Sequence, residues 1–336
     1  MPKKALITGI AGQDGSYLSN FLLSKGYEVH GTFRRNSSQE FYRLKELNIF
    51  DELNLHEVEL TEKYQIEGLL KAHEYDEIYN LAAQSFVATS FNSPLYTFDV
   101  NTISLLNILE CIKNFSSNTK LYQASTSEMF GKVQTTPQNE STPFYPRSPY
   151  GVSKLASHWM LVNYRESYDL FLTSGILFNH ESPFRGLEFI TKKITNSVAR
   201  IKKGEMGCVT VGNLNASRDW GFAGDFVKAM YFMLQSDIPD DYVIGTGETH
   251  SIREMIELAF SYIDVEIVWE GKDLNEIGVD KRDGKALVKV SQDFFRPAEV
   301  DLLLSDTSKA KKALGWVPET SFKDLIKMMV EYDLSK

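Results

Sequence analysis

Short apolar runs alternate with longer amphipathic stretches through the first half of the chain. The apolar runs predict buried strands over residues 5–8, 28–32, 55–59, 77–81, 121–125 and 171–177. Helical spacing of the apolar residues predicts helices over residues 16–25 and about 96–113, and Gly26 follows the first at a position typical of a helix C-cap. Regular alternation of strands and helices predicts a doubly wound α/β fold with a parallel sheet.

The pattern changes after Phe178. Residues 179–219 are rich in Arg, Lys, Gly and Asn, whereas a helix over about 222–234 and a strand over 242–245 indicate a return to the sheet. The chain from Ser251 onward mixes helix and strand, and the polar stretch 271–285 predicts a loop. We therefore expect a larger domain of residues 1–178 plus about 219–250. Residues of about 179–218 plus 251–336 should form a smaller C-terminal α/β lobe that binds substrate.

Composition excludes several classes of protein. The net charge of -9 over 336 residues argues against binding to nucleic acid or to an anionic membrane surface. Cys111 and Cys208 are not in a CxxC pair, so we expect neither a disulfide framework nor a metal site. A signal peptide and a stretch of transmembrane length are not expected either, which predicts a cytoplasmic protein.

A glycine-rich loop follows the first predicted strand and opens the first helix. It contains Gly9, Gly12, Gln13, Asp14 and Gly15. Glycines at this spacing allow a tight turn and let the backbone approach a pyrophosphate at the helix N-terminus, as in Rossmann domains. Glycine clusters also occur in plain turns, but the flanking strands and helix favour dinucleotide binding.

The end of the second predicted strand indicates which dinucleotide is bound. NAD-dependent Rossmann proteins usually have a carboxylate there, which binds the ribose 2′-hydroxyl. This chain has Arg34 and Arg35 instead, and guanidinium groups suit a 2′-phosphate. We therefore expect the larger domain to be a Rossmann domain that binds NADP; the alternative is a solvated basic turn.

The positions of four polar residues predict that they form one catalytic site. Tyr150 and Lys154 are four residues apart, which places them on one face of a helix, and a nearby ammonium group lowers the pKa of a phenol. Thr126 and Glu128 follow the fifth predicted strand, and ligands of doubly wound sheets bind at the carboxyl ends of strands. The four side chains should therefore meet beside the nicotinamide.

At this point the sequence resembles a known family. Thr8-Gly9 with the glycine loop, Asn80-Leu81-Ala82-Ala83, Tyr150 with Lys154, and residues 314–318 resemble the extended short-chain dehydrogenases/reductases. Narrower stretches resemble the GDP-mannose 4,6-dehydratase family, and together they span nearly the whole chain. They are residues 12–18, 142–150, 163–168, 177–183, 218–221 and 295–300.

The resemblance implies a dehydration at the sugar. Tyr150, helped by Lys154 and Thr126, would remove the proton of the 4-hydroxyl while C4 gives a hydride to NADP. Glu128 would remove the C5 proton and then protonate the departing 6-hydroxyl. An epimerase or 4-ketoreductase of the same fold has no need of a carboxylate at this position. A non-catalytic nucleotide-binding protein is the other alternative.

The resemblance also implies binding residues. Near the cofactor it places Leu60, Leu81, Ala82, Ala83, Ser85, Tyr96, His180 and Arg185. On the substrate side it places Ser85, Glu128, Asn179, Lys193, Arg218, Arg296 and Glu299. Two of these residues have an alternative interpretation without a binding role. A single histidine such as His180 is often structural, and Lys193 could lie on a solvated helix face.

Departures from the family pattern put the sugar in question more than the chemistry. Phe184, Phe222, Glu59, Gln84 and Phe86 replace the usual residues. GDP-mannose and the larger GDP-D-glycero-manno-heptose therefore both stay open as substrates. Relatives form homodimers or homotetramers, so an oligomer is expected.

Overall fold

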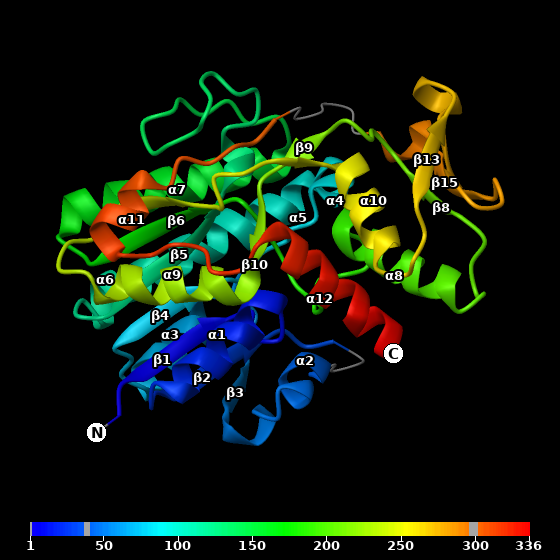
Figure 1. Ribbon diagram of the computed structural model, residues 1–336. Coiled ribbons are helices and arrows are strands. Elements are labelled where there is room, and N and C mark those ends of the chain that lie inside the picture. Colours follow the sequence, from blue (N-terminus) through cyan, green and yellow to red (C-terminus); the bar gives the residue numbers. More distant parts are fainter. Residues whose placement is uncertain (1, 37–40, 296–301) are drawn as a thin grey trace.

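The larger domain is built on a seven-stranded parallel sheet. The computed structural model describes residues 2–36, 41–295 and 302–336 (Figure 1). The strand order is β11-β6-β5-β4-β1-β2-β3, and each neighbouring pair is parallel. The strands are β1 (Lys4–Thr8), β2 (Glu28–Phe33), β3 (Asn54–Glu57), β4 (Glu77–Asn80), β5 (Lys120–Thr126), β6 (Leu172–Leu177) and β11 (Asp241–Ile244). The prediction of a doubly wound Rossmann sheet is confirmed.

Helices cover both faces of this sheet (Figure 1). Leu18 and Leu22 of α1 (Gln13–Ser24) and Met230 of α9 (Ala223–Gln235) belong to the apolar core on one face. The core on the other face is formed by α3 (Lys63–Ala72), α6 (Ser104–Phe115) and α7 (Pro149–Tyr168). Shorter helices at the edges of the domain are α2 (Tyr42–Glu46), α4 (Val87–Asn92), α5 (Pro94–Phe98) and α11 (Ser308–Leu314). Short 3-10 turns are η1 (Phe50–Glu52), η3 (Ser127–Met129), η4 (Asp273–Asn275) and η5 (Gln292–Phe294).

The helix predicted over about 96–113 is interrupted. Its first part is α5, its last part is α6, and the π-helical segment η2 (Asp99–Ile103) joins them. Asn101 in this segment accepts a hydrogen bond from the backbone N–H of Gln84 at 2.9 Å and donates one to Ser153 Oγ at 2.9 Å. Such π segments are frequent at functional sites. Here the segment ties the loop after β4 to α7.

The smaller lobe has a four-stranded sheet in the order β13-β14-β15-β8. The strands are β8 (Val209–Val211), β13 (Ile267–Glu270), β14 (Ile277–Asp280) and β15 (Ala286–Val290), and the helices α8 (Ile190–Lys202), α10 (Ile252–Ser261) and α12 (Phe322–Ser335) complete its core. The prediction of a loop over 271–285 was wrong in part, because β14 lies within it. Pairing with β13 and β15 stabilises this strand, and composition does not reveal such pairing.

Two small sheets connect the domains. β7 (Asn179–Glu181) pairs with β10 (Trp220–Phe222), and β9 (Ser217–Arg218) pairs with β12 (His250–Ser251). Ala310 and Trp316, from the part of the chain predicted for the smaller lobe, pack in the core of the larger domain. The boundary between the domains stays a prediction. None of the helices in the described ranges combines the length and apolarity that crossing a membrane requires.

Candidate active site

A large cavity opens at the carboxyl ends of the central strands and extends to the smaller lobe. Its volume is about 1430 Å³. Most of the predicted site residues line it: Gly9, Gly12, Gln13, Asp14, Gly15, Arg34, Leu60, Leu81, Ala82, Ala83, Ser85, Tyr96, Thr126, Glu128, Tyr150, Lys154, Asn179, His180, Arg185, Lys193 and Arg218. Arg35 does not belong to the described lining, and its side chain is exposed. Arg296 and Glu299 lie outside the described residues.

The glycine loop forms a tight cradle at the N-terminus of α1. Gly9 has a left-handed φ of 70°, and a Cβ on Gly15 would lie 2.6 Å from the carbonyl oxygen of Gly9. Larger residues would therefore fill the space between loop and helix. Arg43 holds the loop from outside, because its Nη1 donates to the carbonyl oxygen of Ala11 at 3.1 Å. The cradle fits a pyrophosphate at the helix N-terminus.

An ion pair joins this loop to β7. The carboxylate of Asp14 lies 2.7 Å from Nε2 of His180, and Gln13 Nε2 donates to the backbone oxygen of His180 at 3.1 Å. Burial alone would raise the pKa of Asp14, but the charge and hydrogen bond of His180 outweigh it and lower that pKa. Burial likewise opposes the charged form of His180, and Asp14 overcomes it, so the pKa of His180 is raised. Each group therefore favours the charged form of the other.

Arg34 is the cation at the end of β2. It lines the cavity, and its Nη1 donates a hydrogen bond to the hydroxyl of Tyr96. Leu60, from the loop after β3, lies in the same wall and is buried. The structure thus separates two arginines that the sequence treats alike: Arg34 and Asn36 line the cavity, whereas Arg35 between them does not belong to the described lining.

Thr126 and Glu128 lie where β5 ends. Thr126 caps the turn η3, and its Oγ1 accepts from the backbone N–H of Glu128 at 3.2 Å. Tyr150 lies in the first turn of α7, where Ser148 Oγ accepts from the backbone N–H of Gly151 at 3.0 Å. These two capped turns bring the carboxyl group of Glu128 and the phenol of Tyr150 into one cavity.

Burial has the largest effect on the pKa values of the catalytic pair. It raises the pKa of Tyr150 to about 12, although a hydrogen bond with Thr126 acts in the opposite direction. Burial lowers the pKa of Lys154 to about 8, and its Nζ donates to the carbonyl oxygen of Ala124 at 2.8 Å. The expected lowering of the Tyr150 pKa is not seen in the protein alone. The phenol stays protonated at neutral pH until further positive charge comes near.

A buried polar network fixes the strand ends beneath the cavity. Thr8 Oγ1 donates to Asn80 Oδ1 at 2.7 Å and accepts from the backbone N–H groups of Leu81 and Ala82. Asn80 Nδ2 then donates to Gln123 Oε1 at 2.6 Å. Sequence reasoning quoted Thr8 and Asn80 only as motif residues and did not include Gln123. Thr8 and Asn80 are polar residues that end otherwise buried strands, which was the available signal for these two, whereas Gln123 lies within β5.

The substrate end of the cavity is more basic. Asn179 on β7 and the buried Arg218 on β9 line it. Nζ of Lys193 on α8 lies 3.4 Å from the ring centre of Phe294. Burial lowers the pKa of Lys193. Arg185 forms an ion pair with Glu181 at 3.0 Å and stacks on Phe189. Cationic groups of this kind suit a diphosphate.

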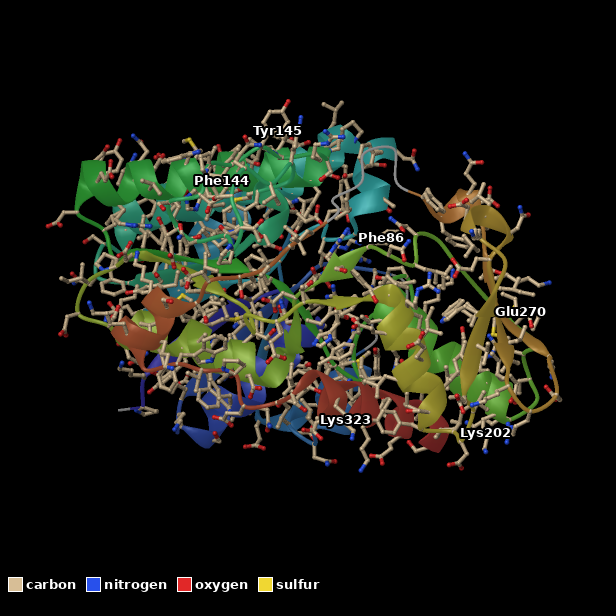
Figure 2. The ribbon with its side chains drawn as sticks, turned by 45° about the horizontal axis from the view of Figure 1, so that its top comes forward. Phe86, Phe144, Tyr145, Lys202, Glu270 and Lys323 are labelled. Carbon is tan, nitrogen blue, oxygen red and sulfur yellow. The ribbon has the colours of Figure 1, made fainter. Side chains whose placement is uncertain are left out.

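The residues that depart from the family pattern divide into two groups. Phe184 and Phe222 do not belong to the described cavity lining, and both pack against Tyr17. Glu59, Gln84 and Phe86 do line the cavity. The ring of Phe86 packs edge to face on Phe189 where the two domains meet (Figure 2).

Comparison with known proteins gives one consistent result. A family model described as GDP-mannose 4,6 dehydratase matches residues 6–329. The chain is 51% identical to the GDP-mannose 4,6 dehydratase of Cricetulus griseus over 99% of this chain and 91% of that protein. It is 48% identical to the enzyme of that name from Vibrio cholerae, over 99% and 94% of the two chains.

Solved structures share the fold. The UDP-glucose 4-epimerase of Thermotoga maritima, in complex with UDP-glucose, is 25% identical, with a TM-score of 0.82 over 98% of both chains. The dTDP-glucose 4,6-dehydratase of Bacillus anthracis, in complex with NAD, is 20% identical, with a TM-score of 0.81 over 98% of this chain and 96% of that chain. Both support the assignment of the larger domain as a Rossmann fold.

Proposed function

The chain belongs to the GDP-mannose 4,6-dehydratase family, and from this premise we propose that it converts a GDP-sugar to the 4-keto-6-deoxy sugar with loss of water. One observation supports the proposal above all: the carboxyl group of Glu128 and the phenol of Tyr150 line the same cavity as the glycine cradle. A hydro-lyase of this kind needs a base at the 4-hydroxyl and an acid–base group at C5 and C6. The two side chains can fill these roles.

The cofactor of the proposed reaction is NADP. Gly9, Gly12 and Gly15 would hold its pyrophosphate at the N-terminus of α1, and Arg34 would bind the 2′-phosphate. When bound, NADP+ accepts the hydride that leaves C4, adds positive charge beside the phenol, and returns the hydride to C6. The cofactor is thus unchanged at the end of each turnover.

Tyr150 takes the proton of the 4-hydroxyl. Its pKa of about 12 in the protein alone makes it a poor base, so the phenolate forms only when positive charge lowers that pKa. Thr126 holds the phenol by a hydrogen bond. Lys154 is a positioning residue. Its Nζ donates a hydrogen bond to the carbonyl oxygen of Ala124 on β5, which holds the helix of Tyr150 against that strand.

Glu128 carries out the elimination. The new 4-ketone acidifies the C5 proton, which the carboxylate removes. The same proton then passes to the 6-hydroxyl, and water leaves. When the hydride returns to C6, C5 needs a proton, and Tyr150 would give it the one taken from the 4-hydroxyl, which restores both side chains. Because one group serves as base and then as acid, no other proton donor is required in this step. Asn179, Lys193 and Arg218 hold the GDP portion, with Arg296 and Glu299 proposed beside it.

Incubation with GDP-mannose and with GDP-D-glycero-manno-heptose, followed by mass analysis, tests the proposal. The expected product has lost one water, contains a 4-ketone and forms without net NADPH production. A product isomeric with the substrate would indicate an epimerase, and net consumption of NADPH would indicate a 4-ketoreductase. Either result would overturn the assignment. The relative rates decide which of the two sugars is preferred.

We also propose that the chain acts as a homodimer or homotetramer in the cytoplasm. Large apolar side chains are exposed on the adjacent helices α5 and α7, among them Leu95, Val152 and Trp159. Contiguous exposed apolar side chains favour a protein interface. The cysteines Cys111 and Cys208 are free thiols, which fits a reducing compartment.

A further inference from the structure

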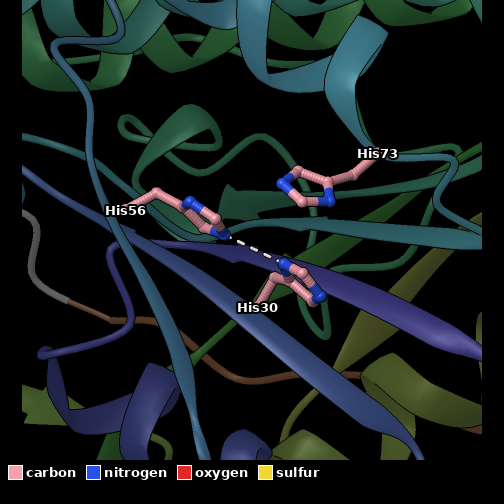
Figure 3. A group of neighbouring side chains, drawn as sticks. All are labelled: His30, His56 and His73. Carbon is pink, nitrogen blue, oxygen red and sulfur yellow. Dashed lines mark hydrogen bonds between the residues drawn. The ribbon is translucent and has the colours of Figure 1, made fainter.

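Three histidines converge at the edge of the central sheet, outside the described lining of the active-site cavity. His30 lies on β2, His56 lies on β3, and His73 follows the last turn of α3. One ring nitrogen of each lies within 4.8 Å of the others. Figure 3 shows the three rings grouped around a common centre, with a hydrogen bond between His30 and His56.

We propose that His30, His56 and His73 bind one divalent transition-metal ion, with Zn²⁺ as the reference ion. Imidazole nitrogens are preferred ligands of zinc, nickel and copper. Three histidines with a water molecule in the fourth position form a common zinc coordination sphere. The proposal concerns the edge of the sheet and is independent of the proposed reaction.

The spacing of the nitrogens suits one ion. Nδ1 of His30 and Nε2 of His56 are 2.9 Å apart. An ion bound to both at about 2.0–2.1 Å would hold them at an angle of roughly 90°. In a tetrahedral site two ligand nitrogens are about 3.3–3.4 Å apart. The three nitrogens lie within 4.8 Å of one another in the ion-free protein, so His73 would move inward by up to about 1.5 Å, and it lies at a helix end where the chain can adjust.

A carboxylate orients the buried ligand. Nε2 of His30 lies 2.9 Å from Oε1 of Glu28. Because a carboxylate accepts, the proton of His30 is on Nε2, and the lone pair of Nδ1 points to the other two rings. A carboxylate behind a metal-binding histidine is a common feature of metal sites. Lys4 is the neighbouring cation, and it pairs with the same carboxylate at 3.6 Å.

The group of three histidines is only partly buried, which leaves a path for an ion. The His30 side chain is buried, whereas those of His56 and His73 are half-buried. Solvent can therefore reach the centre of the group and supply the fourth ligand. The hydroxyl of Tyr75 lies 3.2 Å from Nδ1 of His30 and competes with His56 for the single lone pair of that nitrogen, so it would turn away when the ion binds.

A bound ion would cross-link the edge strand of the sheet. It would join β3 to β2 and to the end of α3, and these strands continue to Leu60 and Arg34 in the cavity wall. We therefore expect the ion to stabilise the part of the domain that holds the adenosine half of the cofactor. No step of the reaction passes through it.

The test is a metal titration of the full chain after treatment with a chelator. Zn²⁺ binding is measured by calorimetry, and Co²⁺ provides a visible spectrum that reports nitrogen ligands. We expect one ion per chain. His56→Ala and His73→Ala should each weaken Zn²⁺ binding by about tenfold or more, and Glu28→Gln should weaken it by roughly 10–100-fold. Because both mutated histidines are half-buried, these variants should still fold, which circular dichroism checks.

His250→Ala is the matched control. This histidine lies near two carboxylates, 3.8 Å from Glu248 and 3.7 Å from Glu254, and such a group could also bind Zn²⁺. The variant therefore tests whether the ion binds there instead of at the three histidines. It should leave Zn²⁺ affinity unchanged. The proposal is overturned if the unmodified chain binds no ion, or if His250→Ala abolishes binding while His56→Ala and His73→Ala retain it.

Discussion

At the scale of single residues, Glu128 is the residue that distinguishes the proposed dehydration from the simpler reactions of this fold. Replacing it with Gln keeps the size and polarity of the side chain but removes the acid–base group. We expect turnover to fall roughly 100- to 10,000-fold, while oxidation at C4 is partly spared. Reduced cofactor should then accumulate in a single turnover, which NADPH fluorescence measures.

Glu270→Gln provides the comparison for this change. Glu270 is exposed on β13 of the smaller lobe and does not belong to the described cavity lining (Figure 2). Its loss should leave turnover unchanged. If Glu128→Gln forms the dehydrated product at the normal rate, the role of this carboxylate in elimination is wrong.

Arg34 should set the preference for NADP. A charge-assisted hydrogen bond to phosphate contributes about 1.5–3 kcal/mol, so Arg34→Ala should weaken NADP+ binding roughly 10- to 100-fold. Binding of NAD+ should change little, because it has no 2′-phosphate. Fluorescence titration with both dinucleotides measures the ratio. Arg200→Ala, at the exposed end of α8, is the control, and an equal loss for both dinucleotides would contradict the assignment.

The sequence predicted which residues belong to the site, but it did not predict which of them contact each other. Glu128, Tyr150 and Arg34 were predicted from position relative to strands and helices, because the carboxyl ends of parallel strands meet at one edge. The distinction between Arg34 and Arg35 depends on which of two neighbouring side chains faces the cavity, which the sequence does not reveal. The meeting of His30, His56 and His73 depends on strand register and on the end of α3, so cysteine spacing alone predicted no metal site.

At the scale of elements, Gly151 lets α7 approach the turn that holds Glu128. A Cβ at this position would lie 2.8 Å from the carbonyl oxygen of Glu128 and 3.1 Å from Cβ of Pro146. Gly151→Ala should therefore push the helix from the turn, cost about 1–3 kcal/mol of unfolding free energy and lower turnover by up to about 100-fold. Thermal unfolding and steady-state kinetics measure both effects.

Gly68 in α3 offers the opposite case. A Cβ there meets nothing within 4 Å, so Gly68→Ala should stabilise the protein by about 0.4–1 kcal/mol. Turnover should stay the same. Equal behaviour of the two alanine variants would show that the close approach at Gly151 does not matter.

The ion pair of Asp14 and His180 should make stability depend on pH in the cofactor-free protein. The pKa of His180 is raised above 6.5. Its contribution to the free energy of unfolding is therefore fully present below pH 6.5 and is lost as the pH rises through the raised pKa. The pKa of Asp14 is lowered from 3.8, so its contribution is lost only as pH falls through the lowered value. The pair is therefore most stabilising between these two limits.

Unfolding of the unmodified chain and of His180→Gln tests this dependence. The advantage of the unmodified chain should be about 1–3 kcal/mol near pH 6 and should shrink at higher pH. Asp14→Asn should remove the same advantage, and the double variant should lose little more. A constant difference across the whole pH range would contradict the ionic pair.

The elements themselves were largely predictable where periodicity is strong. The strands of the central sheet begin and end within one or two residues of the predicted ranges, because buried parallel strands are continuous apolar runs. The helix over 96–113 could not be predicted to break, since Asn101 forms its bonds with distant chain segments. The strand β14 was missed because its pairing partners, and not its own composition, stabilise it.

At the scale of the molecule, the cavity belongs to both domains. The central sheet provides the cradle and the catalytic residues, whereas α8 and β9 provide Lys193 and Arg218. Trp316, close to the C-terminus, packs in the core of the larger domain and donates its Nε1–H to the backbone oxygen of Asp225. The chain thus crosses several times between the domains, which fixes how the cofactor and substrate walls face each other.

Helix α7 has two faces of different character. Its inward face has the buried residues Tyr150 and Lys154, whereas Val152 and Trp159, seven residues apart, are 49% and 56% exposed on another face. Leu95 on the adjacent α5 is 81% exposed. A dimer that covers this surface would pack directly behind the catalytic helix.

If the proposed dimer uses this surface, a charge at Trp159 should weaken the association and lower activity together. Burying an unpaired aspartate at the position of a large aromatic anchor commonly costs at least about 2 kcal/mol, so Trp159→Asp should weaken association by roughly 30-fold or more. Sedimentation equilibrium measures the association, and activity should fall on dilution in parallel. Ile238→Asp, 74% exposed between α9 and β11, should change neither. If the unmodified chain is a monomer at micromolar concentration, or if Trp159→Asp associates normally, the surface of α5 and α7 is not an interface.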